Sequence, residues 1–260
     1  MRRFQLIEIE DLAWCPRGVR DAATDYLQFM VEHTDPYAVA GPRLREVLGR
    51  MGAQQVVDLC SGAGGPWLGL LSEVVSGTDG GLTVCLTDAY PNRAALDRLR
   101  RLSGGQLKGV ATPVDATRVP HHLKGFRTLF SSFHHFPPEE ARAILADAVH
   151  RGEGIAIFEA TQRRLLAILA MLMVPLMILL VTPMIRPFRW SRLFWTYMIP
   201  VVPLIGLFDG IVSCLRTYTP EELQAMVEGL DTNDYLWKIG EEPIPCSPIR
   251  MTYLIGVPPD

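Results

Sequence analysis

VVDLCSGAGGPW, residues 56–67, is the stretch that decides the fold of this chain. An apolar run ends at Asp58, and the glycines that follow, Gly62 and Gly64, have no Cβ and let the backbone approach a ligand closely. The dinucleotide fingerprint GxGxxG would need a third glycine at the position of Trp67. The stretch therefore predicts a buried strand and a ligand-binding turn, but not a pyrophosphate loop.

Short apolar runs alternate with helical patterns on the C-terminal side of this turn. Strands that alternate with helices predict parallel βαβ units, with a sheet that is covered on both faces. Helical spacing of apolar residues over 19–33 and after Pro42 predicts an N-terminal helical cap, residues 1–51, before the first strand. The expected strands are 55–60, 82–88, 109–114, 126–133, 154–160, 235–240 and 250–257.

Acidic residues follow three successive strands of this pattern. Asp58 ends the first strand, Asp88 ends the second, and Asp115 with Ala116 follows the third. Ligands of open α/β sheets bind outside the carboxyl ends of the strands, so these side chains are expected to share one site. A carboxylate at Asp88 can accept hydrogen bonds from two ribose hydroxyls, and Asp115 can accept from an exocyclic adenine amine.

Four motifs, in order along the chain, resemble those of class I S-adenosylmethionine-dependent methyltransferases. DLCSGAG resembles their first motif, TDAYPN their second-strand acid, VDATRVP their adenine-side motif, and SSFHHFPPEEARAIL their fourth-strand motif. The resemblance covers roughly residues 52–160 and 219–257. It implies an α/β fold with an open, mostly parallel seven-stranded sheet of order 3-2-1-4-5-7-6, the last strand being antiparallel. The chain departs from the pattern at Cys60, where the family usually has a glycine.

The resemblance implies S-adenosyl-L-methionine (SAM) as the cofactor. SAM has no phosphate, so the third glycine of the dinucleotide fingerprint is dispensable. No metal is expected as a cofactor. The residues expected to bind SAM are Asp58, Cys60, Ser61, Gly62, Gly64, Asp88, Ala89, Asp115, Ala116 and Ser131.

His134 and His135 are the candidate catalytic residues, because histidine can take a proton from an acceptor near neutral pH. In an extended segment their side chains would point to opposite faces, so at most one would meet the substrate. The alternative is a structural turn with both imidazoles bonded to backbone. A metal site that combines this pair with His121 and His122 is disfavoured, because no acid stands at ligand spacing.

The segment that contains His33, Asp35 and Tyr37 has two interpretations. It could close over the donor and shape the acceptor pocket, but a surface loop with helix caps is favoured.

An apolar insertion, residues 161–216, interrupts the α/β pattern. Residues 165–185 and 193–208 contain no charge, and RPFRWSR lies between them. Pro175 and Pro183 are expected to break the first helix. The flanking strands belong to one sheet, which excludes a single membrane span. The favoured arrangement is a broken helical element in the membrane interface, with its arginines on anionic head groups. The alternative is a lid that packs on the core or on a second subunit.

The composition limits which kinds of partner and which cellular compartment are expected. The net charge of −3 argues against a nucleic-acid partner, and five widely spaced cysteines without a CxxC fit a reducing compartment. The N-terminus does not have the pattern of a secretory signal. The expected location is cytoplasmic, with peripheral attachment to the inner face of the membrane, and homo-oligomerisation is left open.

The sequence thus predicts a SAM-dependent methyltransferase, with a SAM-binding core over 52–160 and 217–260. The acceptor is expected to be an O, N or C nucleophile on a hydrophobic small molecule or lipid. Two alternatives stay open: a non-catalytic SAM-binding module associated with membranes, and a nicotinamide-dependent oxidoreductase.

Overall fold

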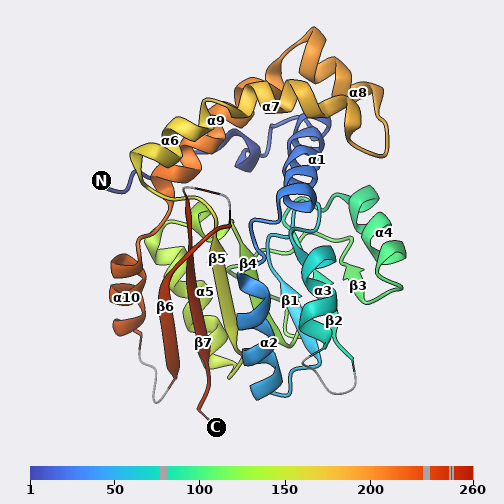
Figure 1. The fold of residues 1–260 in the computed structure, drawn as a ribbon. Helices are drawn as coiled ribbons and strands as arrows, with labels where there is room; N and C mark the ends of the chain where they lie inside the picture. Colours follow the sequence, from blue (N-terminus) through green and yellow to red (C-terminus); the bar gives the residue numbers. More distant parts are fainter. Residues whose placement is uncertain (77–80, 231–234, 246, 248, 260) are drawn as a thin grey trace.

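A seven-stranded sheet forms the centre of the molecule in the computed structural model, which describes residues 1–259 except 77–80, 231–234, 246 and 248. The strand order is β3-β2-β1-β4-β5-β7-β6, and β7 is antiparallel to both of its neighbours while the other pairs are parallel. The predicted fold class is therefore confirmed (Figure 1). The strands are β1 Gln55–Asp58, β2 Thr83–Leu86, β3 Leu107–Gly109, β4 Phe126–Phe130, β5 Ile155–Glu159, β6 Leu236–Pro243 and β7 Arg250–Val257.

The third strand lies earlier in the chain than its predicted position, 109–114. In the structure β3 ends at Gly109. The Val110 N–H still donates to the Leu86 carbonyl, but Pro113 has no N–H with which to continue a ladder. Val114 instead donates to the carbonyl of Asp88, which ties this segment to the end of β2.

Helices cover both faces of the sheet. Neighbouring residues of β1 point to opposite faces: Val56 belongs to the core that includes α2, α3 and α4, and Val57 to the core that includes α5 and α10. Thr219 and Glu222 form a capping box at the start of α10. The helices are α2 Ala40–Arg50, α3 Trp67–Val75, α4 Arg93–Leu102, α5 Pro138–His150 and α10 Pro220–Glu228.

The insertion forms a helical hairpin above the carboxyl ends of the strands (Figure 1). Pro175 lies in the first turn of α7, and Pro183 in the first turn of η3, so the helix is broken where predicted. The return helix, α9, packs along α6 and α7. The elements are α6 Leu165–Met171, α7 Val174–Val181, η3 Thr182–Met184, α8 Trp190–Leu193, η4 Phe194–Met198 and α9 Val201–Arg216.

Two glycines of α9, four residues apart, allow this helix to approach α6 and α7 closely. A Cβ on Gly206 would lie 2.5 Å from the Cδ1 of Ile178, and one on Gly210 would lie 2.9 Å from the Sδ of Met171. This small-xxx-small spacing is typical of helix pairs that approach closely in membranes.

The hairpin rests on α1, Arg17–Thr34, through an apolar cluster and an ion pair. Arg192 is buried and donates to Asp25 at 2.6 Å, and Arg189 lies 3.4 Å from the same carboxylate. The expectation that these arginines face lipid head groups was therefore wrong. The acid of α1 holds them on the protein side of the hairpin.

Candidate active site

A cavity of about 680 Å³ lies at the carboxyl edge of the sheet, between the strand ends and α1. Its wall includes Cys60–Gly65 apart from Gly64, and Asp88 with the two residues that follow it. Asp115 and the residues after β4 complete the wall on this side. The structure thus places most of the residues that were predicted to bind SAM around one cavity, at the edge where open α/β sheets bind ligands.

The loop after β1 has backbone conformations with positive φ angles, at Cys60 as well as at its glycines. Cys60 has φ 57° and Gly64 has φ 119°, and both values lie in the region that glycine favours. A Cβ on Gly64 would lie 2.0 Å from the Cδ1 of Leu99, so this glycine is required by packing as well as by conformation. Cys60 keeps the turn at a cost of about 1 kcal/mol in backbone strain.

Asp88 joins the loop after β1 to the segment after β2. Its Oδ2 accepts from the Gly62 N–H at 2.7 Å, and its Oδ1 accepts from the Tyr90 N–H at 2.7 Å. A carboxylate can accept about four hydrogen bonds, so one acceptor position per oxygen remains for a ligand. Asp88 and Ala89 both line the cavity, as a ribose-binding segment requires.

Asp58 is placed differently from the other acids. Its side chain is buried away from the cavity wall and accepts from Thr128 Oγ1 at 2.6 Å. Burial raises the pKa of Asp58 to about 6, against the hydrogen bonds that lower it. The Asp58 carbonyl also accepts from the hydroxyls of Ser61 and Thr87. Asp58 therefore holds the turn in shape from behind.

Asp115 lines the cavity, but its neighbour Ala116 does not. Both the N–H and the hydroxyl of Thr117 donate to Asp115 Oδ1, at 2.8 and 2.7 Å. Oδ2 makes none of these bonds, so it can accept from a ligand amine. Ala116 is buried and packs in the core that contains Val57 and Leu129.

Ser131 and Tyr37 form a second wall of the cavity. The Tyr37 hydroxyl donates to Ser131 Oγ at 2.6 Å, and that oxygen also accepts from the Ala160 N–H at 2.9 Å. Tyr37 is only 4% exposed, so its assignment to a surface loop was wrong. Burial, the main cause, raises the pKa of Tyr37, which keeps the hydroxyl protonated as a donor. An aromatic residue in an otherwise polar segment was the available sequence signal.

His134 and His135 lie on a turn of 3₁₀ helix, η2 Phe133–His135, and not in an extended segment. Their rings stack with centroids 4.5 Å apart, so the prediction that they face opposite ways was wrong. A 3₁₀ turn advances about 120° per residue, which does not produce the alternation of a strand. His135 lines the cavity, whereas His134 is buried beside it.

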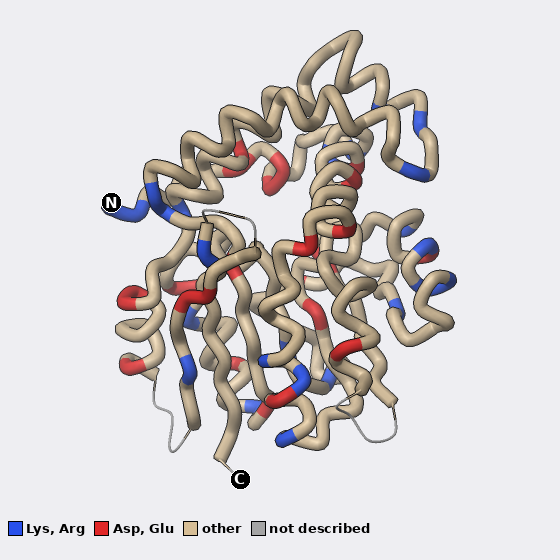
Figure 2. Tube along the Cα trace, viewed as in Figure 1, with Lys and Arg blue, Asp and Glu red and all other residues tan. Residues whose placement is uncertain are grey.

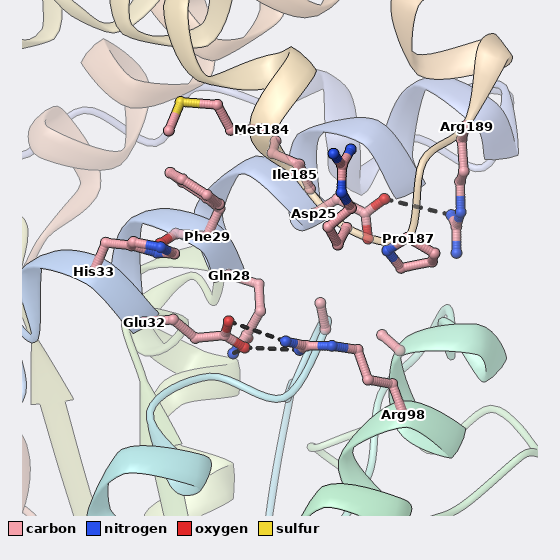
Figure 3. Close-up of a pocket in the computed structure, with 13 residues that line it drawn as sticks. Asp25, Gln28, Phe29, Glu32, His33, Arg98, Met184, Ile185, Pro187 and Arg189 are labelled. Carbon is pink, nitrogen blue, oxygen red and sulfur yellow. Dashed lines mark hydrogen bonds and ion pairs between the residues drawn. The ribbon is translucent and has the colours of Figure 1, made fainter.

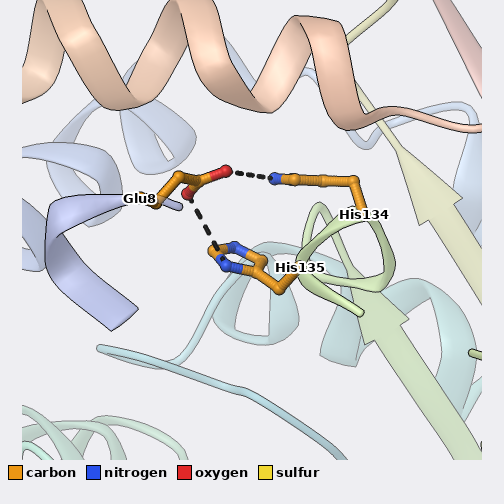
Figure 4. Close-up of side chains that lie close together, drawn as sticks. All are labelled: Glu8, His134 and His135. Carbon is orange, nitrogen blue, oxygen red and sulfur yellow. Dashed lines mark ion pairs between the residues drawn. The ribbon is translucent and has the colours of Figure 1, made fainter. Parts of the chain in front are cut away.

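The N-terminal segment supplies acids that no local motif indicates. Asp11, in η1 Ile9–Asp11, accepts from His135 Nδ1 at 2.9 Å, and Glu8 lies between the two histidines (Figure 4). Glu159, at the end of β5, holds His134 Nδ1 at 2.5 Å. Burial alone would lower the pKa of His134, but the charges and hydrogen bonds of Glu159 and Glu8 outweigh it and raise the pKa to about 10.

A smaller cavity of about 250 Å³ lies between α1, α4 and the loop after η3. Met184 and Ile185 border it from the hairpin side, and Glu32 with Arg98 from the core side (Figure 3). The Glu32 carboxylate accepts from both Nη atoms of Arg98, at 2.8 and 3.2 Å. Gln28 and Ala63 line both cavities. The end of the hairpin therefore borders a space that adjoins the donor loop.

No protein-family profile and no curated protein matches this sequence. Solved structures share its fold at low identity. An O-methyltransferase family protein from Burkholderia thailandensis aligns with a TM-score of 0.50 and 20% identity, over 92% of this chain and 59% of that chain. The magnesium protoporphyrin IX methyltransferase of Synechocystis PCC 6803, solved with bound SAM, aligns with a TM-score of 0.50 and 12% identity, over 89% of this chain and 82% of that one. The fold is that of the class I SAM-dependent methyltransferases.

Proposed function

We propose that this protein is a SAM-dependent methyltransferase that acts on a hydrophobic small molecule or lipid. The observation that carries the proposal is the 680 Å³ cavity, whose wall combines the loop after β1 with Asp88 and Asp115 at the carboxyl edge of the sheet. The remaining acceptor positions on Asp88 fit two ribose hydroxyls, and Asp115 Oδ2 fits an adenine amine.

SAM would supply an activated methyl group to an O, N or C nucleophile. The chain's own contribution is alignment of the acceptor and exclusion of water, because methyl transfer is an in-line displacement. His135 is the histidine that reaches the cavity, with Asp11 bonded to Nδ1. We expect it to orient the acceptor or take its proton where the nucleophile carries one. His134, bonded to Glu159, supports this wall without reaching the cavity.

The apolar hairpin supports a lipophilic acceptor. Residues Leu165–Met184 have a mean hydropathy of 2.8 over their most apolar window, and only 22% of that window is buried. Figure 2 shows that charged residues are absent from the ridge formed by α6, α7 and the facing part of α9, and gather toward its ends. The large exposed apolar residues include Leu165, Leu166, Leu169, Leu172, Met173, Leu176, Leu179, Leu180, Met184, Leu204 and Phe208.

We propose that this ridge binds a membrane surface. A continuous apolar ridge of this kind is typical of interfacial helices, which bury 5–10 Å deep at the boundary between head groups and acyl chains. Because Arg189 and Arg192 are paired with Asp25, and of the three arginines in this segment Arg186 alone is exposed, attachment is expected to come mainly from apolar burial and to depend little on salt. Attachment would also place the hairpin side of the smaller cavity near a lipid-soluble acceptor.

Flotation with phosphatidylcholine vesicles tests the membrane part. The wild-type chain is expected to float, and the double variant Leu176→Gln/Leu180→Gln to stay at the bottom. Leu102→Gln on α4 is the matched control, since Leu102 is 55% exposed but far from the ridge in the fold. A wild-type chain that stays at the bottom while forming a concentration-dependent dimer would show that a second copy covers the ridge.

The donor part has its own test. Calorimetric titration is expected to show binding of S-adenosylhomocysteine and none of NADH. Incubation with methyl-labelled SAM and a cell lipid extract is expected to transfer label into the organic phase. Donor binding without any transfer would support a non-catalytic module, and NADH binding without S-adenosylhomocysteine binding would overturn the proposal.

A further inference from the structure

Glu8, His134 and His135 meet beside the cavity, and Glu8 lies at the outer limit of hydrogen-bond distance from both imidazoles. His134 Nε2 lies 3.5 Å from Glu8 Oε1, and His135 Nδ1 lies 3.6 Å from Glu8 Oε2 (Figure 4). One ligand atom from each of the three residues lies within 4.8 Å of the others. A tetrahedral ion with bonds of about 2.0–2.1 Å has edges of about 3.3–3.4 Å, so Glu8 would have to turn one oxygen toward both nitrogens, and His135 Nδ1 would exchange its hydrogen bond to Asp11 for the ion.

His134 is held in the orientation that a metal ligand needs. Its Nε2 is buried, and its nearest polar neighbour is Glu8 Oε1 at 3.5 Å. Its Nδ1 is bonded to Glu159, and Glu159 accepts in turn from the Phe133 N–H at 2.8 Å. Metal-binding histidines usually donate their second ring N–H to a carboxylate in this way, which directs the free lone pair of Nε2 at the ion. Here Nε2 points toward Glu8, and an ion that binds between them displaces the Nε2 proton.

The local charge also favours a cation. The carboxylates of Glu8 and Asp11 share the guanidinium of Arg216, and the ion-pair partner of Glu159 is His134. Arg216 Nη1 lies 3.4 Å from Glu8 Oε1 and 3.1 Å from Asp11 Oδ2. With both imidazoles neutral, the cluster carries two excess negative charges. One divalent cation balances them.

We propose that Glu8, His134 and His135 bind one divalent first-row transition ion, for which Zn²⁺ has the best match. Two imidazoles and one carboxylate are a donor set that zinc accepts in four-coordinate sites, whereas calcium and magnesium prefer oxygen ligands alone. Binding requires only the free chain, so the proposal stands independently of methyl transfer.

The position of the site gives the ion an open side. Three protein ligands leave one position of a tetrahedron free, as in catalytic zinc sites. Of the three ligands His135 lines the cavity, so a free position on its side would be open to water or an acceptor oxygen. When His135 is a ligand it is no longer available as a base. A bound hydroxyl would then lose its proton more easily because the ion lowers its pKa.

The test uses untagged, chelator-stripped full-length protein titrated with ZnCl₂ alone. One equivalent is expected to bind. Glu8→Gln and His135→Gln are each expected to weaken binding at least about 10-fold, and Glu159→Gln about 10- to 100-fold, the range for loss of a partner that orients a ligand. The double variant His121→Gln/His122→Gln is the matched control, because both residues are exposed and outside the cluster. It should bind as the wild type does.

Cobalt gives a second measurement on the same variants. Co²⁺ in a four-coordinate site has an intense visible spectrum, which is expected in the wild type and absent in His135→Gln. His135 is partly exposed, so this variant is expected to fold even if Glu8→Gln does not. No binding, or binding that the cluster variants leave unchanged while the surface double variant abolishes it, would overturn the proposal. S-adenosylhomocysteine titrated in excess chelator reports on the donor site separately.

Discussion

Replacing Asp88 with alanine tests the donor site where the structure is most explicit. The carboxylate already holds the N–H groups of Gly62 and Tyr90, each at 2.7 Å, and offers one further acceptor position on each oxygen. Two ribose hydroxyls would fill those positions. Charge-assisted hydrogen bonds contribute about 1.5–3 kcal/mol each at most, and part of this is recovered by water in the variant.

The expected loss for Asp88→Ala is about 1–3 kcal/mol, which is about 5- to 150-fold in the dissociation constant of S-adenosylhomocysteine. Asp88→Asn keeps one acceptor oxygen and is expected to fall between the wild type and the alanine variant. Isothermal titration calorimetry at fixed pH and salt measures all three. Asp97→Ala is the matched control, because Asp97 is an exposed acid on α4.

The reasoning would be refuted by unchanged affinity in Asp88→Ala, which would place the ribose elsewhere. The loop could also collapse when Gly62 loses its acceptor, so thermal unfolding of the free variant must accompany the titration. A variant with a normal melting temperature and a weakened titration supports direct contact. Weakening that Asp88→Asn restores completely would indicate that the carboxylate only holds the loop.

Three further predictions concern stability. Arg192→Met should lower the free energy of unfolding by about 3 kcal/mol in urea titrations, because Asp25 keeps only the more distant Arg189; a loss below about 1 kcal/mol would contradict a buried pair. Gly206→Ala should cost about 1–3 kcal/mol through its contact with α7, whereas Gly69→Ala, with nothing within 4 Å, should be neutral or stabilising in the same assay. Asp58 has its pKa raised to about 6, so its contribution is fully present below pH ~4 and is lost as pH rises through 6. The free energy of unfolding of the wild type should therefore fall by about 2–3 kcal/mol between pH 4 and 8 because of this group. In Asp58→Asn the free energy of unfolding should depend less on pH over this range.

Much of the fold was predictable because each strand and turn places a simple physical demand on its own short stretch of sequence. Each buried strand is a short apolar run, and the turn after β1 needs backbone conformations that glycine favours. The position of β3 was missed because a three-residue strand gives almost no periodic signal, while Pro113 and its neighbours resemble an extended run.

The site was predictable only in part, for a different reason. Asp88 and Asp115 follow from the rule that strand ends share one edge. Glu8 and Asp11 come from a segment more than a hundred residues before the histidines, and a single sequence carries no signal for that contact. Asp58 was assigned to the ligand because a residue at a strand end can point either to the cavity or to the core. Arg189 and Arg192 were assigned to lipid because the sequence does not show that Asp25 lies beside them.

One face of helix α9 is exposed on the molecular surface, and the opposite face bonds to residues beside the cavity. Leu204 and Phe208 are exposed on the outside. On the inside, Ser213 Oγ donates to Glu8 Oε1 at 3.0 Å, and Arg216 Nε donates to the His134 carbonyl at 3.1 Å. A displacement of α9 therefore moves the cavity wall with it. Any partner that prefers one position of this helix must change the affinity of the cavity for its ligands, and a ligand in the cavity must change the affinity for that partner by the same factor.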